Sequence, residues 1–271
     1  MDIFRVLLIE PLANGLAVFY KIFGGNMGVA IIAFSLFLRL LLTPLTKPYM
    51  ESMKKMKQYS KDLEKLKKRH KDDKAKLMKA QADFYKEKGI NPGSGCLPYL
   101  LQIIILIALF RVFTGILVSN GDVTSKFNEM LYDSVKFSSD TVINTKFLYL
   151  DVTKPDVIRL RDLPFPIPGP FIILSALTQF LSAKMTAPYV KEEQKRAKKT
   201  KSDIDDFQVA MQSSMIYTFP IMTLLIGISF PSGLAIYWFL FSLYQAVQQF
   251  RSTGWGGLTP WIERINLLKS V

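Results

Sequence analysis

The sequence predicts an all-α, polytopic membrane protein, and its composition and its charge pattern both support this prediction. Of the 271 residues, 49% are hydrophobic, and the mean hydropathy is +0.20. The apolar residues are concentrated in long runs, whereas the lysines and arginines gather in the segments between the runs. We therefore expect helices that cross a bilayer, joined by charged loops that set their orientation.

Five stretches are long and apolar enough to cross the hydrocarbon, which requires about 20 residues of helix. They cover residues 27–46, 96–117, 169–187, 211–230 and 232–250. The last two are joined only by the turn Pro231-Ser232-Gly233, whose last two residues already open the fifth stretch. Such a short connection permits only a tight turn, so residues 211–250 should form a transmembrane hairpin.

Loop charges predict the topology. The segment 47–91 carries fifteen basic and seven acidic residues, whereas the loop 118–168 carries six basic and seven acidic ones. Because cytoplasmic loops are enriched in lysine and arginine, the first segment should be cytoplasmic and the second extracytoplasmic. The basic run KEEQKRAKKTK in the loop 188–210 returns the chain to the cytoplasm, where the tail 251–271 follows. The amino end should lie outside and the carboxyl end inside.

Residues 1–24 are expected to form an amphipathic helix at the membrane surface. Glu10 and Pro11 interrupt the apolar run, and no small-residue cleavage site follows, so the segment does not fit a signal peptide. We expect it to be retained.

The segment 47–93 is predicted to be a cytoplasmic helical hairpin, because apolar residues recur every three or four positions on both sides of a polar break at 70–73. The apolar seam includes Met53, Tyr59, Leu63, Leu66, Leu77 and Phe84. A solvated spacer and a docking arm for a partner or for lipid headgroups are both consistent with this seam.

Polar side chains follow single faces of the predicted spans. Ser35, Arg39 and Thr43 are four residues apart and stack along one face of the first span. Comparable polar positions occur in the other spans: Gln102, Ser175, Thr178, Gln179, Ser182, Gln212, Ser213, Ser214, Trp238, Ser242, Gln245 and Gln249. Each could be interhelical glue, contributing about 0.6 kcal/mol. The shared bias toward the cytoplasmic halves, together with a charged Arg39, favours a hydrated groove that opens to the cytoplasm.

Several function classes are disfavoured. The net charge of +13 is explained by topology, so nucleic-acid recognition is not expected. With one cysteine and one histidine, we expect neither a disulfide framework nor a metal site. The predicted spans contain no Asp or Glu, and no catalytic or nucleotide-binding motif occurs, so we expect no cofactor, no enzymatic activity and no proton-coupled transport.

The order of motifs resembles the YidC/Oxa/Alb family of membrane protein insertases. The resemblance is carried by Gly28, Arg39, the run Thr43-Pro44-Leu45-Thr46-Lys47, the basic hairpin, KEKGINPGSGCLPYLLQIIILIALFRV and FPSGLAIYWFLFSLYQAVQQF. It implies a bacterial inner membrane protein with five helices around a hydrophilic groove, open to the cytoplasm and to lipid. Arg39 matches the groove arginine, Ser35 and Gln102 match groove positions, and Trp238 matches an aromatic position that touches the inserting segment.

The resemblance also implies the partners, which are nascent membrane protein clients, membrane lipid and, as candidates, the ribosome, a targeting receptor and a Sec-type translocon. The family often combines insertion with a chaperone role in folding its clients. A small-solute channel or transporter, a lipid scramblase and a passive assembly chaperone remain the alternative functions, because each could use a hydrated groove. The absence of acidic coupling residues and of an internal repeat argues against the transporter.

Overall fold

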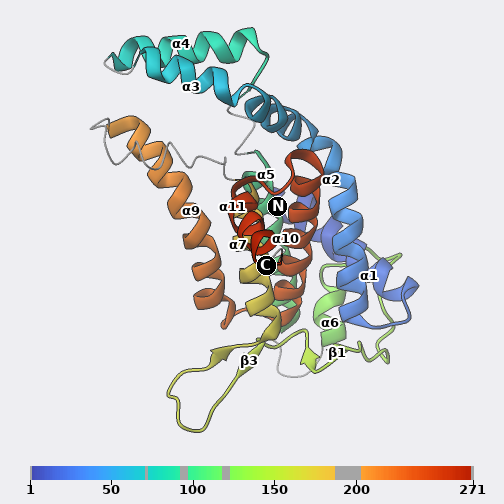
Figure 1. Ribbon diagram of the computed structural model, residues 1–271. Helices are drawn as coiled ribbons and strands as arrows, with labels where there is room; N and C mark the ends of the chain where they lie inside the picture. The colour runs from blue at the N-terminus through green and yellow to red at the C-terminus, as the bar shows by residue number, and fades with distance from the viewer. Residues whose placement is uncertain (1, 71–72, 92–96, 118–122, 187–202, 270–271) are drawn as a thin grey trace. The chain divides into compact units, whose positions relative to one another are not determined.

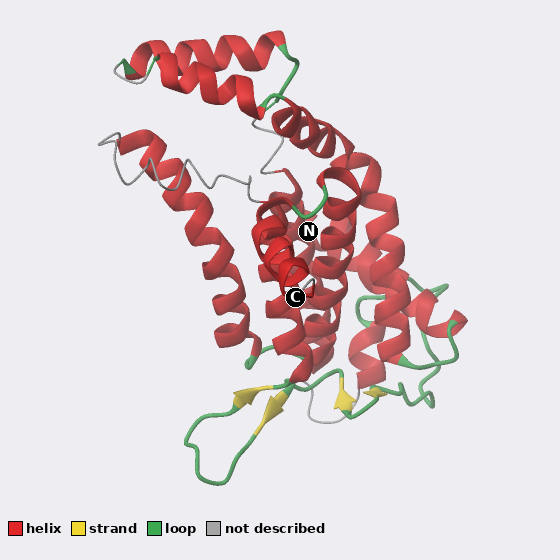
Figure 2. Ribbon diagram, in the orientation of Figure 1, coloured by secondary structure: helices red, strands yellow, loops and turns green. Residues whose placement is uncertain are grey.

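The computed structural model describes residues 2–70, 73–91, 97–117, 123–186 and 203–269, and most of this chain is helical (Figure 1, Figure 2). The chain divides into two compact units. The first comprises Met1–Leu42, Leu101–Gln179 and Phe219–Tyr244, and the second comprises Thr43–Leu100, Phe180–Thr218 and Gln245–Val271. Several long helices contribute to both units.

The long helices lie close to the predicted spans. They are α2 (Met27–Gln58), α5 (Leu97–Leu117), α7 (Pro170–Thr186), α9 (Asp203–Gly227) and α10 (Ser232–Thr253). Within the described residues, α2 alone is a helix long and apolar enough to span a membrane, over Met27–Met56. Shorter apolar stretches occur at Leu101–Ile116, Pro170–Met185 and Ile216–Gly227. A mostly helical fold is thus confirmed, and the number of spans stays a prediction.

The first helix does not end where the sequence analysis expected. The predicted span stops at residue 46, but α2 continues through Pro44 and Pro48 to Gln58. A proline removes one backbone hydrogen bond and commonly kinks a helix, yet the remaining bonds of a long helix can carry the chain past it. The predicted loop 188–210 lies mostly outside the described residues, and its last part belongs to α9.

The amino-terminal segment packs against the core of the first unit. It forms a π-helical turn, η1 (Arg5–Ile9), followed by α1 (Glu10–Ile22). The segment is amphipathic as expected, but protein covers its buried face: Ala13, Leu16 and Ala17 are buried in the core with residues of α2, α5 and α10. Gly15 permits this close approach, because a Cβ there would lie 2.5 Å from the ring of Phe34.

The loop 118–168 contains a small folded cap. Its elements are α6 (Val123–Asn128), the antiparallel pair β1 (Lys146–Phe147) and β2 (Leu150–Asp151), and the antiparallel pair β3 (Val157–Ile158) and β4 (Ile167–Pro168). These strands are the exception to the predicted all-α class. Phe127, Leu131, Phe137 and Val152 from the cap are buried in the same core as the helices. The loop is therefore part of the packed unit.

Hydrogen bonds fasten the cap to α1. The buried Asn14 side chain donates to the carbonyl of Met130 (3.2 Å) and accepts from the amide of Tyr132 (2.8 Å). The hydroxyl of Tyr20 accepts from the amide of Asn144 at 2.9 Å. These polar side chains of α1 are thus hydrogen-bonded to backbone groups of the cap, while the apolar face of the helix packs in the core.

The end of the cap also joins the starts of α7 and α10. Ser232 donates its amide to the carbonyl of Lys154 (2.7 Å) and its hydroxyl to that of Asp151 (3.0 Å). Asp156, which is buried, accepts the amides of Phe171 (2.8 Å) and Ile172 (3.3 Å) in the first turn of α7. A carboxylate in this position satisfies amides that the helix itself leaves unbonded and complements the helix dipole.

In the second unit, α3 (Ser60–Arg69) and α4 (Lys74–Glu87) form an antiparallel hairpin (Figure 1). The tail is also helical, with η3 (Gly256–Leu258) leading into α11 (Thr259–Lys269). Gly256 has φ +49° and lies against the carbonyl of Met185, so a side chain there would clash. Trp261 of α11 then packs on Phe180 of α7, with ring centroids 6.1 Å apart.

We predict that Asp156→Ala lowers the free energy of unfolding by about 2 kcal/mol, because two buried amides and the hydroxyl of Tyr149 lose a charged acceptor. Unfolding in mixed detergent micelles measures the change. Asp162→Ala, which removes an exposed carboxylate from the same loop, is the control. Equal effects of the two substitutions would contradict a capping role for Asp156.

Candidate functional site

Arg39 is enclosed by protein inside an otherwise apolar stretch of α2. Its side chain is 5% exposed, whereas its neighbours Leu40 and Leu41 are 62% and 58% exposed. This is the reverse of a water-soluble helix, where the charged residue would face out and the leucines in. The arrangement is the one expected of a helix whose outer face contacts lipid.

Two aromatic rings of α10 hold the guanidinium. Its Cζ lies 4.3 Å from the ring centroid of Phe241 and 5.1 Å from that of Tyr244. Cation–π contacts of this kind contribute about 0.5–2 kcal/mol each, more when water is excluded. Tyr237, one turn earlier on the same helix, is close enough to interact electrostatically with Arg39.

Gln102 of α5 joins this group. Its side-chain carbonyl accepts a hydrogen bond from the hydroxyl of Tyr237 at 3.3 Å. Its amide nitrogen is buried and has no hydrogen-bond partner within the described part of the chain. Buried amides are normally paired, so this nitrogen is a donor that a further group can satisfy.

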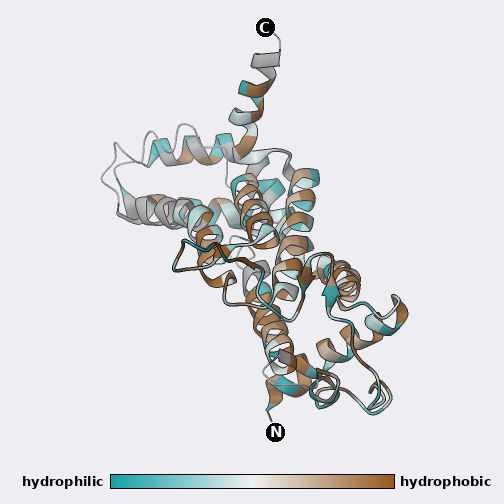
Figure 3. Ribbon diagram, turned by 90° about the horizontal axis from the view of Figure 1, so that it is seen from below, coloured by the Kyte–Doolittle hydropathy of each residue, from teal (hydrophilic) through white to brown (hydrophobic). Residues whose placement is uncertain are grey.

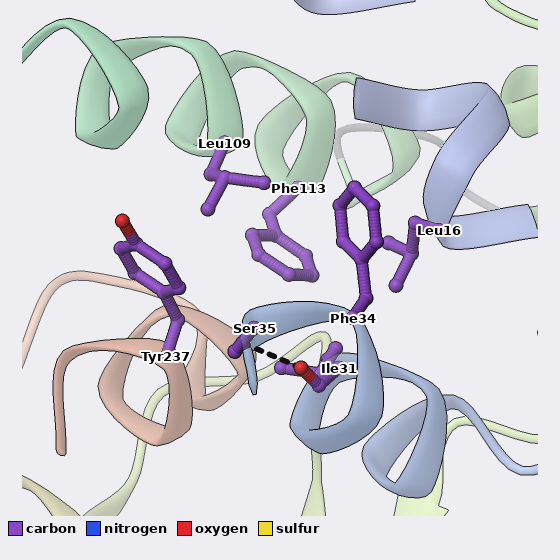
Figure 4. A pocket seen from close by; sticks show the side chains of 7 residues that line it. All are labelled: Leu16, Ile31, Phe34, Ser35, Leu109, Phe113 and Tyr237. Carbon is purple, nitrogen blue, oxygen red and sulfur yellow. Dashed lines mark hydrogen bonds between the residues drawn. The ribbon is translucent and has the colours of Figure 1, made fainter. Parts of the chain in front are cut away.

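Ser35 lies one turn before Arg39 and lines a small cavity (Figure 4). The hydroxyl bonds to the carbonyl of Ile31 in its own helix, and Tyr237, Leu109 and Phe113 face it from α10 and α5. The cavity measures about 10 Å³, which is room for about one water molecule. It is mostly apolar and is not by itself a hydrated groove.

The other predicted groove residues have different surroundings. Ser175 is fully buried and donates to the carbonyl of Ala235 at 2.9 Å, which links α7 to α10. Gln179 accepts from the hydroxyl of Thr223 at 2.8 Å, which links α7 to α9. Both contacts are hydrogen bonds between helices, which is the structural role that the sequence left open for these residues.

Trp238, Ser242 and Thr43 complete the set of predicted groove residues. Trp238 is half-buried and packs on Phe230, with ring centroids 6.2 Å apart. Ser242 is buried in α10. Thr43 continues the Arg39 face of α2 but belongs to the second unit.

Sequence reasoning missed the aromatic side of the site. It selected the stripe of Trp238, Ser242, Gln245 and Gln249, whereas the residues facing Arg39 are Tyr237, Phe241 and Tyr244. These lie at i, i+4 and i+7, one position before the selected stripe and so about 100° away around the helix. The repeat of rings at that spacing was the available signal.

Hydrophobic residues predominate in the long helices, including α5 and α7 (brown in Figure 3). Many of their apolar side chains are exposed on the surface of the protein. Exposed members of this apolar belt in the first unit include Leu36, Phe37, Leu40, Leu41, Ile103, Ile104, Ile107, Ile173, Leu174, Leu177, Ile221, Met222 and Leu225. An apolar surface of this extent marks a membrane-facing or protein-facing region.

The α3–α4 hairpin contains an apolar seam. Leu63 and Leu77 are buried, and the rings of Tyr59 and Phe84 meet edge to face at 6.0 Å. Leu66 is partly buried, and the side chain of Met53, which belongs to α2, lies outside the description. The ammonium of Lys88 lies 5.5 Å from the ring centroid of Tyr59, which closes the base of the hairpin.

Comparison with known families decides the assignment. The model of the 60Kd inner membrane protein family matches residues 18–254, a range that includes Arg39, the α3–α4 hairpin and the cap. The chain belongs to this family. The resemblance inferred from the motifs is thereby confirmed.

Relatives within the 60Kd inner membrane protein family carry the name membrane protein insertase YidC. One from Chlorobium luteolum is 33% identical over 84% of this chain, and one from Methylobacterium sp. is 31% identical over 96%. The chain spans about a third of the length of these two proteins. A relative from Fusobacterium nucleatum is 30% identical, and the match covers 83% of this chain and 85% of that protein.

We predict that Phe241→Leu lowers the free energy of unfolding by about 1 kcal/mol more in the native background than in an Arg39→Met background, because the cation–π contact exists only with the guanidinium. Unfolding in mixed micelles gives the four values of the cycle. Phe239→Leu, whose ring packs on Phe171, is the control and should be additive with Arg39→Met. An equally additive Phe241→Leu would remove Arg39 from the aromatic site.

Proposed function

We propose that this protein is a membrane protein insertase that moves nascent clients into the bilayer without nucleotide hydrolysis. The observation that carries the proposal is the enclosed Arg39 on an apolar helix, with Gln102 and Tyr237 beside it. Membership of the 60Kd inner membrane protein family and the printed name of its relatives support the same function.

The physical problem for an insertase is to bring a polar, often acidic, client segment through hydrocarbon. In this proposal five helices surround a groove that is hydrated from the cytoplasm, which shortens the dry path. Arg39 attracts negative charge on the client, and the attraction is stronger at low dielectric than in water. Gln102 offers a second donor at the same level.

The apolar part of the client would leave sideways into lipid. Burial of apolar surface stabilises a segment by about 25 cal/mol per Å², so the free energy of an apolar client segment falls as it moves from water to lipid. The exposed leucines, isoleucines and phenylalanines on the outside of the helices support a lateral lipid contact. No chemical energy source is then required.

The proposed orientation follows the loop charges, in a bacterial inner membrane. The cap of residues 123–168 is outside, and the hairpin of α3 and α4 is in the cytoplasm, where it would receive clients from the ribosome, a targeting receptor or a Sec-type translocon. The basic face of the hairpin also suits anionic lipid headgroups.

We predict that Arg39→Ala reduces insertion of a client with an acidic translocated tail about tenfold, and that Arg39→Lys retains more activity because it keeps the charge. A protease-protection assay in proteoliposomes measures insertion. The matched client, with the tail acids changed to amides, should be much less affected. Equal loss with both clients would show that Arg39 acts through structure rather than by charge.

Photocrosslinking tests the groove itself. A photoreactive amino acid at Ser35 or Trp238 should capture a ribosome-stalled client, whereas one at the lipid-facing Ile173 should capture much less. If intact protein inserts the client without adducts at either groove position, the groove is not the path, and the channel and scramblase functions return.

We predict that replacing residues 60–87 by a short Gly-Ser linker reduces client insertion and leaves the spanning helices folded, because the α3–α4 hairpin has its own apolar seam and α2 ends before it. Circular dichroism and melting in micelles report the fold. Unchanged insertion by the shortened protein would make the hairpin a spacer.

A further inference from the structure

The β3–β4 segment exposes an unusual number of large apolar side chains. The two short strands are joined by the loop 159–166, in which the amide of Leu163 bonds to the carbonyl of Leu160 to form a turn. Leu160 is 51% exposed and Phe165 is 61% exposed, and Ile158 and Leu163 are also exposed. Single exposed apolar residues are ordinary, but four within eight residues form a patch that calls for a partner.

The base of this hairpin is fixed at the start of α7. β4 ends at Pro168, and α7 begins at Pro170. Asp156, directly before β3, caps the first turn of α7, and its own carbonyl accepts the amide of Gly169 at 2.8 Å. A Cβ on Gly169 would overlap the Asp156 carboxylate, so only glycine allows this close packing of the strands against the start of α7.

Position and charge favour lipid as the occupant. The exposed apolar residues of α7 begin at Ile173, only a few residues beyond the hairpin, so the hairpin lies beside the level at which the proposed span enters the bilayer. In Figure 1 the loop projects beyond this end of α7. Arg159 and Arg161 are exposed and alternate with Ile158 and Leu160, while Asp162 is the only acid of the hairpin.

This combination is that of a membrane-interface element. Apolar side chains enter the boundary between headgroups and acyl chains, and guanidinium groups bind phosphate through paired hydrogen bonds. Pro164 and Pro166 remove backbone donors from the loop, which makes addition of a peptide strand a poor alternative.

We propose that the hairpin 157–168 is a lipid-binding foot on the outer leaflet. Leu160, Leu163 and Phe165 enter the interface, and Arg159 and Arg161 bind the phosphates of anionic lipids. Because Asp156 joins the foot rigidly to α7, the foot sets the depth of that helix in the bilayer. The inference rests on the proposed function to the extent that α7 crosses the membrane.

Spin-label accessibility tests the foot in the full chain. Cys96, the only native cysteine, is changed to Ser, and single nitroxide labels are placed through Phe165→Cys, Val142→Cys or Leu40→Cys. Val142 is the matched control, since it is 88% exposed in the same cap but lies between Thr141 and the buried Ile143, with no exposed apolar residue next to it in the sequence. The protein is reconstituted in phosphatidylcholine vesicles with or without phosphatidylglycerol, and collision rates with oxygen and with a water-soluble nickel chelate are measured.

We expect the label at 165 to collide several-fold more with oxygen, relative to the nickel chelate, than the label at 142. Phosphatidylglycerol should increase this preference, and Arg161→Ala should reduce the increase. Lys146→Ala, which removes one exposed charge from the cap outside the hairpin, should leave it unchanged.

The label at 40 distinguishes failure of the lipid-binding foot from failure of the proposed membrane arrangement. If it is in lipid while the label at 165 is as water-accessible as that at 142, the foot is wrong and the proposed function stands. If the label at 40 is itself in water, the membrane arrangement behind both is wrong. Shielding of position 165 from both reagents only when a client is added would assign the patch to a protein partner and overturn the lipid foot.

Discussion

The contact of Arg39 with Phe241 and Tyr244 is the interaction on which the site depends. A charged side chain among apolar helices carries an insertion penalty of roughly 3 kcal/mol or more. Two cation–π contacts of up to about 2 kcal/mol each are of the same order, so the faces of two rings can hold the guanidinium in spans whose sequence contains no acidic residue. Because the rings belong to α10 and the arginine to α2, the charge also fixes how these helices face each other, and Gln102 of α5 completes the group through Tyr237.

A second constraint acts at the ends of α7 and α10. The cap contributes buried side chains to the core of the first unit, and it is hydrogen-bonded to α1 through Asn14, to the start of α2 through Met27, to α10 through Ser232 and to α7 through Asp156. A loop that supplies core residues and helix caps restricts the movement of the elements it joins. The cap therefore holds the ends of these helices in place. The movement that the proposed client passage requires is expected from elements that the cap does not bind.

The candidate site was only partly predictable. Arg39 could be singled out because charge in an apolar run is costly. Ser35 and Gln102 could be selected as polar residues in apolar spans, and the family resemblance matched both to groove positions. Ser175 and Gln179 had the same polar appearance but pair with neighbouring helices, since a polar residue in a span shows that it needs a partner without showing which one. The aromatic residues of α10 that contact Arg39 were missed because a search for polar residues selects Ser242 and passes over the adjacent Phe241. Neighbouring residues of a helix point in directions about 100° apart, so the selected stripe lies on a different face.

The sequence by itself determined the helical class, the approximate extent of the long helices, the apolar seam of the α3–α4 hairpin and the family. These follow from local properties, namely apolar run length, residue periodicity, loop charge and motif order. Tertiary structure alone decided that α2 continues through Pro44 and Pro48, that the loop 118–168 contains a folded cap, and which aromatic residues hold Arg39. The cap and the aromatic site depend on contacts between residues far apart in the chain, and neither spacing nor composition specifies which distant groups will meet. The course of α2 past its prolines was not specified because a proline can either end a helix or be accommodated within it.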